Sequence, residues 1–300
     1  MNKPLSIQPI PYQGSKRALA PRICNLFPEK IETLYEPFAG SAAITLYAAT
    51  HELADRFVIG DSYKPLVELW KLRIEQPTEL SEQYSRVWHD QFDVGEGHFN
   101  EIRASFNQTH DPVHLLYLVA RCVKNAVRFN RHGNFTQSAD KRRTGMKPDR
   151  LTRTVHAVSN LLKDRTTLFH GDFNGCMDAA TPDDFIYLDP PYQGTSIGRD
   201  KRYAAQLERE KLIESLIVLH DREVPYILSY DGKSGDKTYG EPLPDAIGAV
   251  RLEIDAGRSS QATLNGRAEA TIESLYVSHG LDADQSKITK SQKAQEALFV

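Results

Sequence analysis

The feature that most constrains the fold is an alternation of short strand-like runs with helical patterns, arranged in two blocks along the chain. β-branched and aromatic residues dominate the runs and turn residues bound them, as expected for strands of a mostly parallel sheet. Helical patterns separate most of the runs, and this alternation requires crossover connections and predicts an open α/β sheet. The predicted strands are Thr33–Glu36, Phe57–Gly60, Thr167–His170, Phe185–Asp189, Tyr226–Ser229, Ala249–Ile254 and Ile272–Ser278. The predicted helices between them are Lys16–Phe27, Ser41–His51, Pro65–Ile74 and Leu207–Asp221.

A stretch between the second and third predicted strands is too long for a crossover connection. Its apolar periodicity is helical, in one pattern from Leu115 to Cys122 and in another from Leu151 to Leu162. A chain of 300 residues is long enough for one large α/β domain that carries such an insertion.

We therefore expect a discontinuous domain formed by residues 1–68 and 164–281, with residues 69–163 as an inserted domain. Residues 282–300 are rich in Lys, Gln and Ser. They are expected to form a polar tail, poorly ordered except for a last helical turn.

Cysteine and histidine usage argues against disulfides and metal sites. Cys24, Cys122 and Cys176 lie far apart and form no C-x-x-C pair, and the ten histidines form no H-E-x-x-H or H-x-E element. No apolar run reaches the roughly 18 residues that a membrane span needs, and no apolar signal region follows Met1–Pro4. We expect a metal-free protein of the reducing cytoplasm with no membrane partner.

Positive charge is concentrated in one segment although the whole chain has a net charge of −3. Between Arg121 and Arg153 there are ten basic residues and two acidic ones. A charge run of this kind is also typical of a solvated surface or loop. Phe129 and Phe135, which lie within the run, supply rings for bases beside charges for phosphates, so the segment is a candidate nucleic-acid interface.

The motif that carries most of the chemistry is Asp189-Pro190-Pro191-Tyr192, which directly follows the apolar run from Phe185 to Leu188. A strand that delivers an acid at its carboxyl end places it in the crevice where open α/β sheets bind ligands. The two prolines stiffen the path of the backbone and leave its carbonyl groups free to accept hydrogen bonds. A carboxylate, a carbonyl group and a stacking ring match the needs of an amino group on a planar base. The competing explanation is a strand followed by a proline-stiffened turn.

A second motif, from Glu36 to Ala43, also stands at a strand end and opens a helix. Its small residues allow a ligand to approach the backbone at the helix N-terminus. The motif lacks the G-x-G-x-x-G pattern of dinucleotide-binding proteins, which disfavours a dehydrogenase. Asp61 ends the next strand, where an acid conventionally binds ribose hydroxyls, and it is also a candidate N-cap for the following helix.

Together these motifs resemble the Dam-type (class D12, alpha group) adenine-specific DNA methyltransferases, over roughly Pro11 to Ser278. The resemblance implies a seven-stranded Rossmann-like methyltransferase sheet with an inserted, mostly helical target-recognition domain that carries a β-hairpin. The motifs that carry it are Tyr12–Lys16, Glu36–Ala43, Asp61, Asp172-Phe173 and Asp189–Tyr192.

The resemblance implies S-adenosylmethionine as the cofactor and duplex DNA as the partner. The expected cofactor contacts are Tyr12, Lys16, Glu36, Phe38, Gly40, Asp61, Asp172, Phe173 and Asp189. The segment Arg128–Phe135 looks like the family's recognition hairpin, in which Arg128 falls where an arginine reads guanine. The expected DNA contacts are Lys124, Arg128, Asn130, Arg131, Asn134, Lys141, Arg142 and Arg143.

The chain departs from the family pattern in two places. Ala42 stands where the family usually has a glycine, and we expect the small alanine to preserve cofactor binding. Thr136-Gln137-Ser138 follows Phe135, unlike the Asn-x-Pro of enzymes that modify GATC, so the target sequence stays open.

The favoured hypothesis is an N6-adenine DNA methyltransferase in which Asp189 and Pro190 accept hydrogen bonds from the amino group and Tyr192 stacks on a flipped base. An N4-cytosine methyltransferase needs the same acceptors, although those enzymes more often carry Ser in place of Asp189. A catalytically silent DNA-binding module and an RNA-directed enzyme are further alternatives. A functional pairing with a restriction endonuclease is left open.

Overall fold

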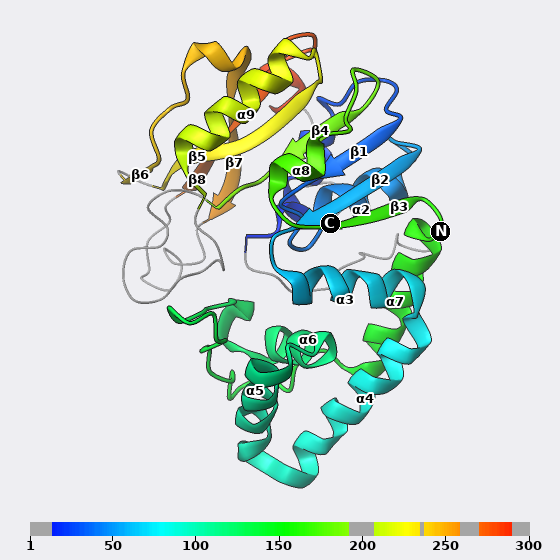
Figure 1. Ribbon diagram of the computed structural model, residues 1–300. Coiled ribbons are helices and arrows are strands. Elements are labelled where there is room, and N and C mark those ends of the chain that lie inside the picture. The colour runs from blue at the N-terminus through cyan, green and yellow to red at the C-terminus, as the bar shows by residue number, and fades with distance from the viewer. Residues whose placement is uncertain (1–13, 192–206, 235–236, 259–269, 290–300) are drawn as a thin grey trace.

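The structure is a computed structural model that describes residues 14–191, 207–234, 237–258 and 270–289. A mixed sheet with helices on both faces lies above a group of further helices (Figure 1). Seven strands follow one hydrogen-bonded path in the order β3-β2-β1-β4-β5-β8-β7, and β6 pairs with β5 beside that path. The strands are β1 Thr33–Glu36, β2 Arg56–Asp61, β3 Thr166–His170, β4 Phe185–Leu188, β5 Tyr226–Ser234, β6 Lys237–Tyr239, β7 Ala249–Arg258 and β8 Ala270–Ser278.

Parallel pairing joins β3, β2, β1, β4 and β5, whereas β8 runs antiparallel between β5 and β7. Every residue of β4 is buried, as expected for a parallel strand that is covered on both faces. Each of the seven predicted strands is present, and the predicted open α/β sheet is confirmed.

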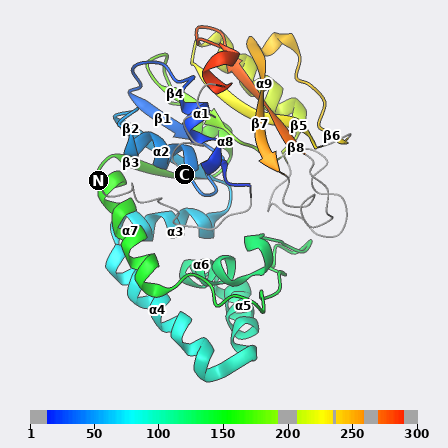
Figure 2. The same ribbon diagram turned by 180° about the vertical axis from the view of Figure 1, so that it is seen from behind.

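Helices cover both faces of the sheet (Figures 1 and 2). One face carries α1 Ala20–Cys24 and α2 Ala43–Thr50, and the opposite face carries α8 Phe173–Met177 and α9 Arg209–Asp221. Helix α3 Lys64–Glu75 packs along β2 and β3. A 3-10 turn, Asp245–Ile247, precedes β7.

The two faces hold separate hydrophobic cores because side chains of a strand alternate between them. In β4, Phe185 and Tyr187 join the core that includes α1 and α2, whereas Ile186 and Leu188 join the core under α9. This alternation fixes the register of the central strand and therefore the place where its carboxyl end leaves the sheet.

Helices fill the segment between β2 and β3 and lie below the sheet in Figure 1. They are α4 Pro77–Val94, α5 His98–Thr109, α6 Pro112–Arg121 and α7 Pro148–Leu162, with 3-10 turns at Gly95–Gly97 and Val123–Asn125. The helical patterns predicted around Leu115 and Leu151 are confirmed as α6 and α7. Helix α3 packs against α4, α6 and α7 as well as on the sheet, and it spans residue 69. The domain bounds drawn from the sequence stay a prediction.

The chain between α6 and α7 folds back on itself without forming named strands. An isolated antiparallel bridge joins Phe129 to Phe135, and the Thr136 amide donates to the Arg128 carbonyl at 2.9 Å. Gly133 has a φ of 80°, in the left-handed region that favours glycine. We call residues 128–136 the recognition loop.

One expectation for the chain ends needs correction. The predicted single helix Lys16–Phe27 is wrong: a 3-10 turn, Lys16–Ala18, precedes α1, because Pro21 belongs in a first helical turn and interrupts a longer helix. A helical turn is present in the tail. Residues 285–289 form a helical turn in which Ile288 is fully buried, and Arg22 Nε donates to its carbonyl at 3.1 Å.

Among the described residues, no helix combines the length and the apolar character that a bilayer crossing demands.

Candidate functional site

Four acidic residues stand at or just beyond the carboxyl ends of four adjacent parallel strands. Glu36 ends β1 and Asp61 ends β2, while Asp172 follows β3 and Asp189 follows β4. Because these strands are neighbours in the order β3-β2-β1-β4, their carboxyl ends meet at one edge of the sheet. The structure therefore brings together the acids that the sequence assigns to one site.

The edge contains the topological switch point of the sheet. From β1 the chain proceeds outwards through β2 to β3, and it then returns to β4 and proceeds to β5 in the opposite direction. Open α/β sheets bind ligands in the crevice that forms where the order reverses. Glu36 and Asp189 flank this point, and Asp189 contributes to raising the pKa of Glu36.

The loop between β1 and α2 is held from three sides. Its Ala39 amide donates to the Gly60 carbonyl at 2.9 Å, and its Gly40 amide donates to Asp61 Oδ2 at 3.3 Å. Trp70 Nε1 of α3 donates to the Gly40 carbonyl at 3.1 Å. Gly40 has a φ of 49°, so the loop uses the conformational freedom of glycine at that position.

Ala42 also adopts a left-handed conformation, with φ 46° and ψ 45°, at the N-cap of α2. This is the position at which the chain has alanine where the family pattern usually has glycine. A side chain at such a φ is strained by roughly 1–2 kcal/mol, which explains the preference for glycine.

The Glu36 carboxylate binds the first turn of α2. Its Oε2 accepts hydrogen bonds from the Thr45 amide at 2.9 Å and from Thr45 Oγ1 at 2.6 Å. Burial raises the pKa of the Glu36 carboxyl to about 7, although the bonds from Thr45 oppose the shift. Glu36 thus positions the N-terminus of α2 beside the carboxyl end of β1, and direct contact with a cofactor stays a prediction.

Asp61 organises the second strand end in a similar way. Its Oδ1 accepts the Tyr63 amide at 2.9 Å while its Oδ2 accepts the Gly40 amide. Burial raises the pKa of the Asp61 carboxyl to about 6, against the effect of these two amides. A carboxylate has about four acceptor positions, so Asp61 can accept a further hydrogen bond from a hydroxyl group.

Lys16 and Asp189 form a buried ion pair across the switch point. Lys16 Nζ lies 2.8 Å from Asp189 Oδ1 and 3.5 Å from Glu273 Oε2, and the Asp189 side chain is 21% exposed. Burial alone would lower the pKa of the Lys16 ammonium group, but attraction by Asp189 and Glu273 outweighs it and raises that pKa. The Ser41 hydroxyl donates to the Ser15 hydroxyl at 2.8 Å and so joins the segment that carries Lys16 to the loop between β1 and α2.

Two aromatic rings lie on the face of the sheet that carries α8 and α9. Phe38 and Phe173 have ring centroids 5.1 Å apart. Asp172 caps α8 by accepting the Asn174 amide at 3.1 Å, and Lys211 Nζ of α9 lies 2.8 Å from its Oδ2. Aromatic rings offer faces on which a planar ligand can stack.

Two predicted site residues, Tyr12 and Tyr192, lie outside the described residues. Pro190 is buried directly after Asp189, as a rigid exit from the sheet requires. The described His, Cys, Asp and Glu side chains form no group of three that could hold a metal ion.

The predicted DNA contacts lie apart from the acids, in the segment between α6 and α7. Lys124, Arg131, Lys141, Arg142 and Arg143 are exposed there. Asp140 shapes part of the segment: its Oδ1 accepts the Arg142 amide at 3.0 Å and its Oδ2 accepts Arg143 Nε at 2.9 Å. The Arg142 amide and then the Arg143 guanidinium lower the pKa of Asp140 below its ordinary value, so Asp140 holds the basic side chains as an anion.

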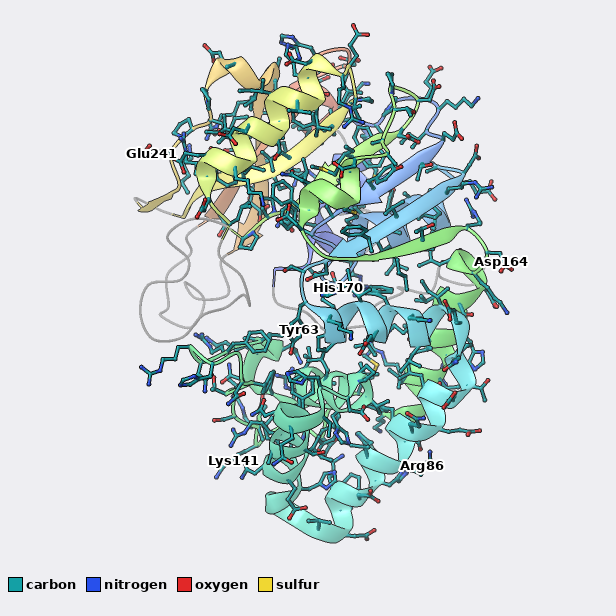
Figure 3. The ribbon with its side chains drawn as sticks, viewed as in Figure 1. Tyr63, Arg86, Lys141, Asp164, His170 and Glu241 are labelled. Carbon is teal, nitrogen blue, oxygen red and sulfur yellow. The ribbon has the colours of Figure 1, made fainter. Side chains whose placement is uncertain are left out.

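The asparagines of the recognition loop differ in exposure. Asn130 Oδ1 accepts the amides of His132 at 2.8 Å and Asn134 at 3.1 Å, so this side chain shapes the turn. Asn134 is exposed, and Arg128 is half-buried. The loop contacts the start of α3 through Phe129, whose ring lies 5.0 Å from that of Tyr63, the residue labelled in Figure 3.

Several residues of the site carry no signal in the sequence. Asn107 of α5 clamps the recognition loop, because its Oδ1 accepts the Phe135 amide at 2.8 Å and its Nδ2 donates to the Phe135 carbonyl at 3.1 Å. Three further side chains contact site residues from distant parts of the chain. They are Trp70 with the Gly40 carbonyl, Lys211 with Asp172, and Glu273 with Lys16. Only the folded chain brings these residues near their partners.

Comparison with known proteins finds a family and several relatives. The family model for D12 class N6 adenine-specific DNA methyltransferase matches residues 12–245. Type II methyltransferase M1.LlaDCHI of Lactococcus lactis subsp. cremoris is 23% identical over 190 residues, which cover 60% of this chain and 64% of that protein. The DNA N-6-adenine-methyltransferase of Escherichia phage P1 is 25% identical over 234 residues, 74% of this chain and 29% of that protein.

A relative of similar extent is the Retron Ec67 DNA adenine methylase of Escherichia coli, 25% identical over 260 residues, 84% of this chain and 87% of that protein. The chain spans less than two thirds of the Lactococcus and phage relatives. The family model nevertheless extends over most of the chain and includes the motifs from Lys16 to Tyr192. The chain therefore belongs to the D12 class N6 adenine-specific DNA methyltransferases.

Proposed function

We propose that this protein transfers a methyl group from S-adenosylmethionine to N6 of an adenine that is flipped out of duplex DNA. The observation that carries the proposal is the position of Asp189. Asp189 follows the buried strand β4 at the switch point, and Pro190 is the next residue in the sequence. The acids that follow β1, β2 and β3 stand at the same edge of the sheet. Membership of the adenine-specific family supports the same assignment.

Asp189 and the Pro190 carbonyl are proposed to accept hydrogen bonds from the two N–H groups of N6. The N6 lone pair is normally delocalised into the ring, and these acceptors favour a tetrahedral nitrogen with a usable lone pair. Asp189 Oδ1 accepts a hydrogen bond from Lys16 Nζ at 2.8 Å, which orients the carboxylate at the end of the strand. Tyr192 is proposed to stack on the flipped adenine.

S-adenosylmethionine is proposed to lie along the edge formed by β1, β2 and β3. When bound, it supplies an electrophilic methyl group on a positively charged sulfur. Asp61 would bind the ribose hydroxyls, Phe38 and Phe173 would contact the adenine ring, and the Gly40 backbone would face the ligand closely. The spacing of these groups around one strand edge supports this arrangement.

The recognition loop and the exposed basic side chains near it are proposed to bind duplex DNA. Lysine and arginine contacts to phosphates provide affinity, whereas Arg128, Asn130 and Asn134 are candidates for contact with base edges. The clamp of Asn107 on Phe135 supports a preformed loop.

The test is methylation of duplex DNA with radiolabelled S-adenosylmethionine, followed by digestion to nucleosides and identification of the labelled base. We expect label in N6-methyldeoxyadenosine alone. Asp189→Ala should lower the transfer rate by a factor of at least about 10² because it removes a preorganised acceptor. Asp183→Ala, an exposed aspartate at the amino end of the same strand, should retain the rate of the unmodified protein.

Label in N4-methyldeoxycytidine would reassign the enzyme to the cytosine class. Retention of DNA without any transfer of label would indicate a binding module. Preferential methylation of structured RNA over duplex DNA would overturn the substrate class. Folding of Asp189→Ala is checked by its melting temperature, because the change removes one anionic partner of the buried Lys16.

A further inference from the structure

Tyr63 connects the carboxyl end of β2 with the recognition loop. Its amide donates to Asp61 Oδ1 at 2.9 Å, and its carbonyl accepts the Leu66 amide at 2.9 Å in the first turn of α3. Its ring lies 5.0 Å from the Phe129 ring, with an interplanar angle of 60° that places the rings edge to face. The backbone of Tyr63 is therefore fixed beside Asp61, while its ring reaches the recognition loop (Figure 3).

A second contact holds the recognition loop from within the helical segment. Phe129 and Phe135 are both buried, and an isolated bridge joins their backbones. Asn107 of α5 binds the Phe135 backbone through two hydrogen bonds. The contact with α5 thus stabilises the shape of the loop, whereas the contact with Tyr63 relates the loop to the strand edge that carries Asp61.

The ring of Tyr63, and not its hydroxyl group, makes this connection. The hydroxyl oxygen is buried and has no hydrogen-bond partner in the part of the chain that the structure describes. Burial, and then the negative charge of Asp61, raise the pKa of the phenol, so the hydroxyl group is neutral. A buried hydroxyl without a partner destabilises a fold, so removal of this group alone leaves the ring contact intact.

Methyl transfer needs two ligands in a fixed relation to each other. Under the proposed function the strand edge holds S-adenosylmethionine and the recognition loop holds DNA. Reacting atoms must approach to about 3–3.5 Å, and a displacement of about 1 Å can slow a reaction roughly 10²-fold. The position of the loop relative to the strand edge therefore affects the rate even after both ligands have bound.

We propose that Tyr63 is a positioning residue, whose ring contact with Phe129 holds the recognition loop in a fixed place relative to Asp61 and so aligns bound DNA for methyl transfer. The inference rests on the proposed function, because it takes the loop to bind DNA and Asp61 to bind the cofactor. In this role Tyr63 acts through Phe129 and contacts neither ligand. Loss of the ring should therefore slow the transfer step more than it weakens the binding of either ligand.

The experiment compares Tyr63→Leu, Tyr63→Phe and Tyr47→Leu in the full chain. Tyr47→Leu is the matched control, because Tyr47 of α2 is also a half-buried tyrosine with a ring contact, 4.2 Å from the ring of His51. Single-turnover methyl transfer is measured at saturating DNA and S-adenosylmethionine, together with the Kd of each ligand and the melting temperature.

Tyr63→Leu is expected to slow single-turnover transfer about tenfold, while both Kd values change less than about threefold. Tyr63→Phe should retain the rate of the unmodified protein, because it keeps the ring. Tyr47→Leu should retain that rate as well. The proposal is overturned by an unchanged rate in Tyr63→Leu, or by an equal loss of rate in Tyr63→Phe or Tyr47→Leu.

A double-mutant cycle tests whether Tyr63 acts through the recognition loop. Phe129→Leu breaks the same contact from the other side and should slow transfer to a similar extent, which keeps the proposal testable if Tyr63→Leu does not fold. In the Phe129→Leu background, Tyr63→Leu should cause little further loss of rate. Full additivity of the two losses would show that Tyr63 acts independently of Phe129 and would refute the inference.

The nucleoside assay on the unmodified protein distinguishes failure of this inference from failure of the proposed function. Absence of N6-methyldeoxyadenosine there removes the basis of both. Normal methylation with an unaffected Tyr63→Leu variant removes only the role of Tyr63.

Discussion

Asp61 illustrates how the surroundings of one residue set the conditions under which it can bind a ligand. Its carboxylate accepts two backbone amides, yet burial still raises its pKa to about 6. A ribose hydroxyl donates to the ionised form, so the ligand and the proton compete for the same group. The charge of Asp61 therefore changes within the pH range in which such a protein is assayed.

We predict that binding of S-adenosylmethionine weakens as pH falls through about 6. The folded protein takes up a proton at Asp61 below this pH, so the Kd should rise by up to roughly tenfold per pH unit and should be constant above pH 7. Isothermal titration calorimetry between pH 5 and 8 measures the Kd for S-adenosylmethionine at each pH. Asp61→Asn should bind more weakly at pH 8 and show no such rise.

Asp55→Asn provides the control, because Asp55 is exposed at the amino end of the same strand. It should retain the pH dependence of the unmodified protein. A pH profile that Asp61→Asn leaves unchanged would contradict the assignment of Asp61 to the cofactor site.

Ala42 gives a second prediction at this scale, on stability. Ala42→Gly should change the free energy of unfolding by less than about 1 kcal/mol, because relief of the left-handed strain offsets the loss of a buried methyl group. Ala48→Gly makes the same substitution at a buried right-handed position within α2 and should cost about 1–2 kcal/mol. Urea unfolding of both variants measures the difference, and equal losses would show that Ala42 is not strained.

The sequence predicts residues whose role depends on local pattern and leaves out those whose role depends on a distant partner. Asp61 and Asp189 could be found because each follows a recognisable strand. Glu273 could not, because its contact with Lys16 depends on the order of the strands and on the face that β8 presents. The left-handed backbone of Ala42 likewise appears only in the structure, although the departure from glycine points to that position.

Among the elements, strands were more predictable than short helices. The central strand β4 is an apolar run that is buried along its whole length, whereas β3 has only half-buried and exposed residues and is predicted by its β-branched and aromatic residues. The first helix was predicted too long because its apolar periodicity continues across Pro21, whereas the backbone does not. The burial of Ile288 in the helical turn of the tail was not predicted, because it depends on packing against distant parts of the chain, among them Arg22.

The clamp between α5 and the recognition loop gives a prediction at the scale of elements. Asn107→Ala removes both hydrogen bonds to the Phe135 backbone, so the loop should lose order in the free protein. We expect the Kd for duplex DNA to rise about tenfold, with the Kd for S-adenosylmethionine unchanged. Fluorescence anisotropy with labelled duplex DNA measures the first value and calorimetry the second.

Asn100→Ala is the matched control, because Asn100 is an exposed asparagine on the same helix. It should leave both Kd values unchanged. Unaltered DNA binding in Asn107→Ala would mean that the loop does not contribute to the DNA interface.

For the molecule as a whole, one hydrophobic core joins the sheet to the helices below it. Buried residues of β1 and β2 belong to the same cluster as those of α4, α6 and α7, and α3 packs against both groups. Such continuity favours a fixed position of the recognition loop relative to the crevice. Tyr63 lies between the two parts, two residues after Asp61, with its ring against Phe129 (Figure 3).

The distribution of charge over the molecule predicts how DNA binding responds to salt. With a net charge of −3, the protein needs its locally basic segment to bind phosphates, and each phosphate contact adds close to 1 to the slope of log Kd against log salt concentration. Lys141→Ala combined with Arg142→Ala, both exposed in that segment, should weaken DNA binding and lower the slope by about 2.

Lys30→Ala combined with Lys163→Ala removes two exposed charges beside the amino ends of β1 and β3, at the opposite edge of the sheet, and should leave the slope unchanged. Anisotropy titrations across a range of salt concentrations decide between the pairs, and an equal reduction in both would mean that general attraction, and not this surface, governs DNA binding.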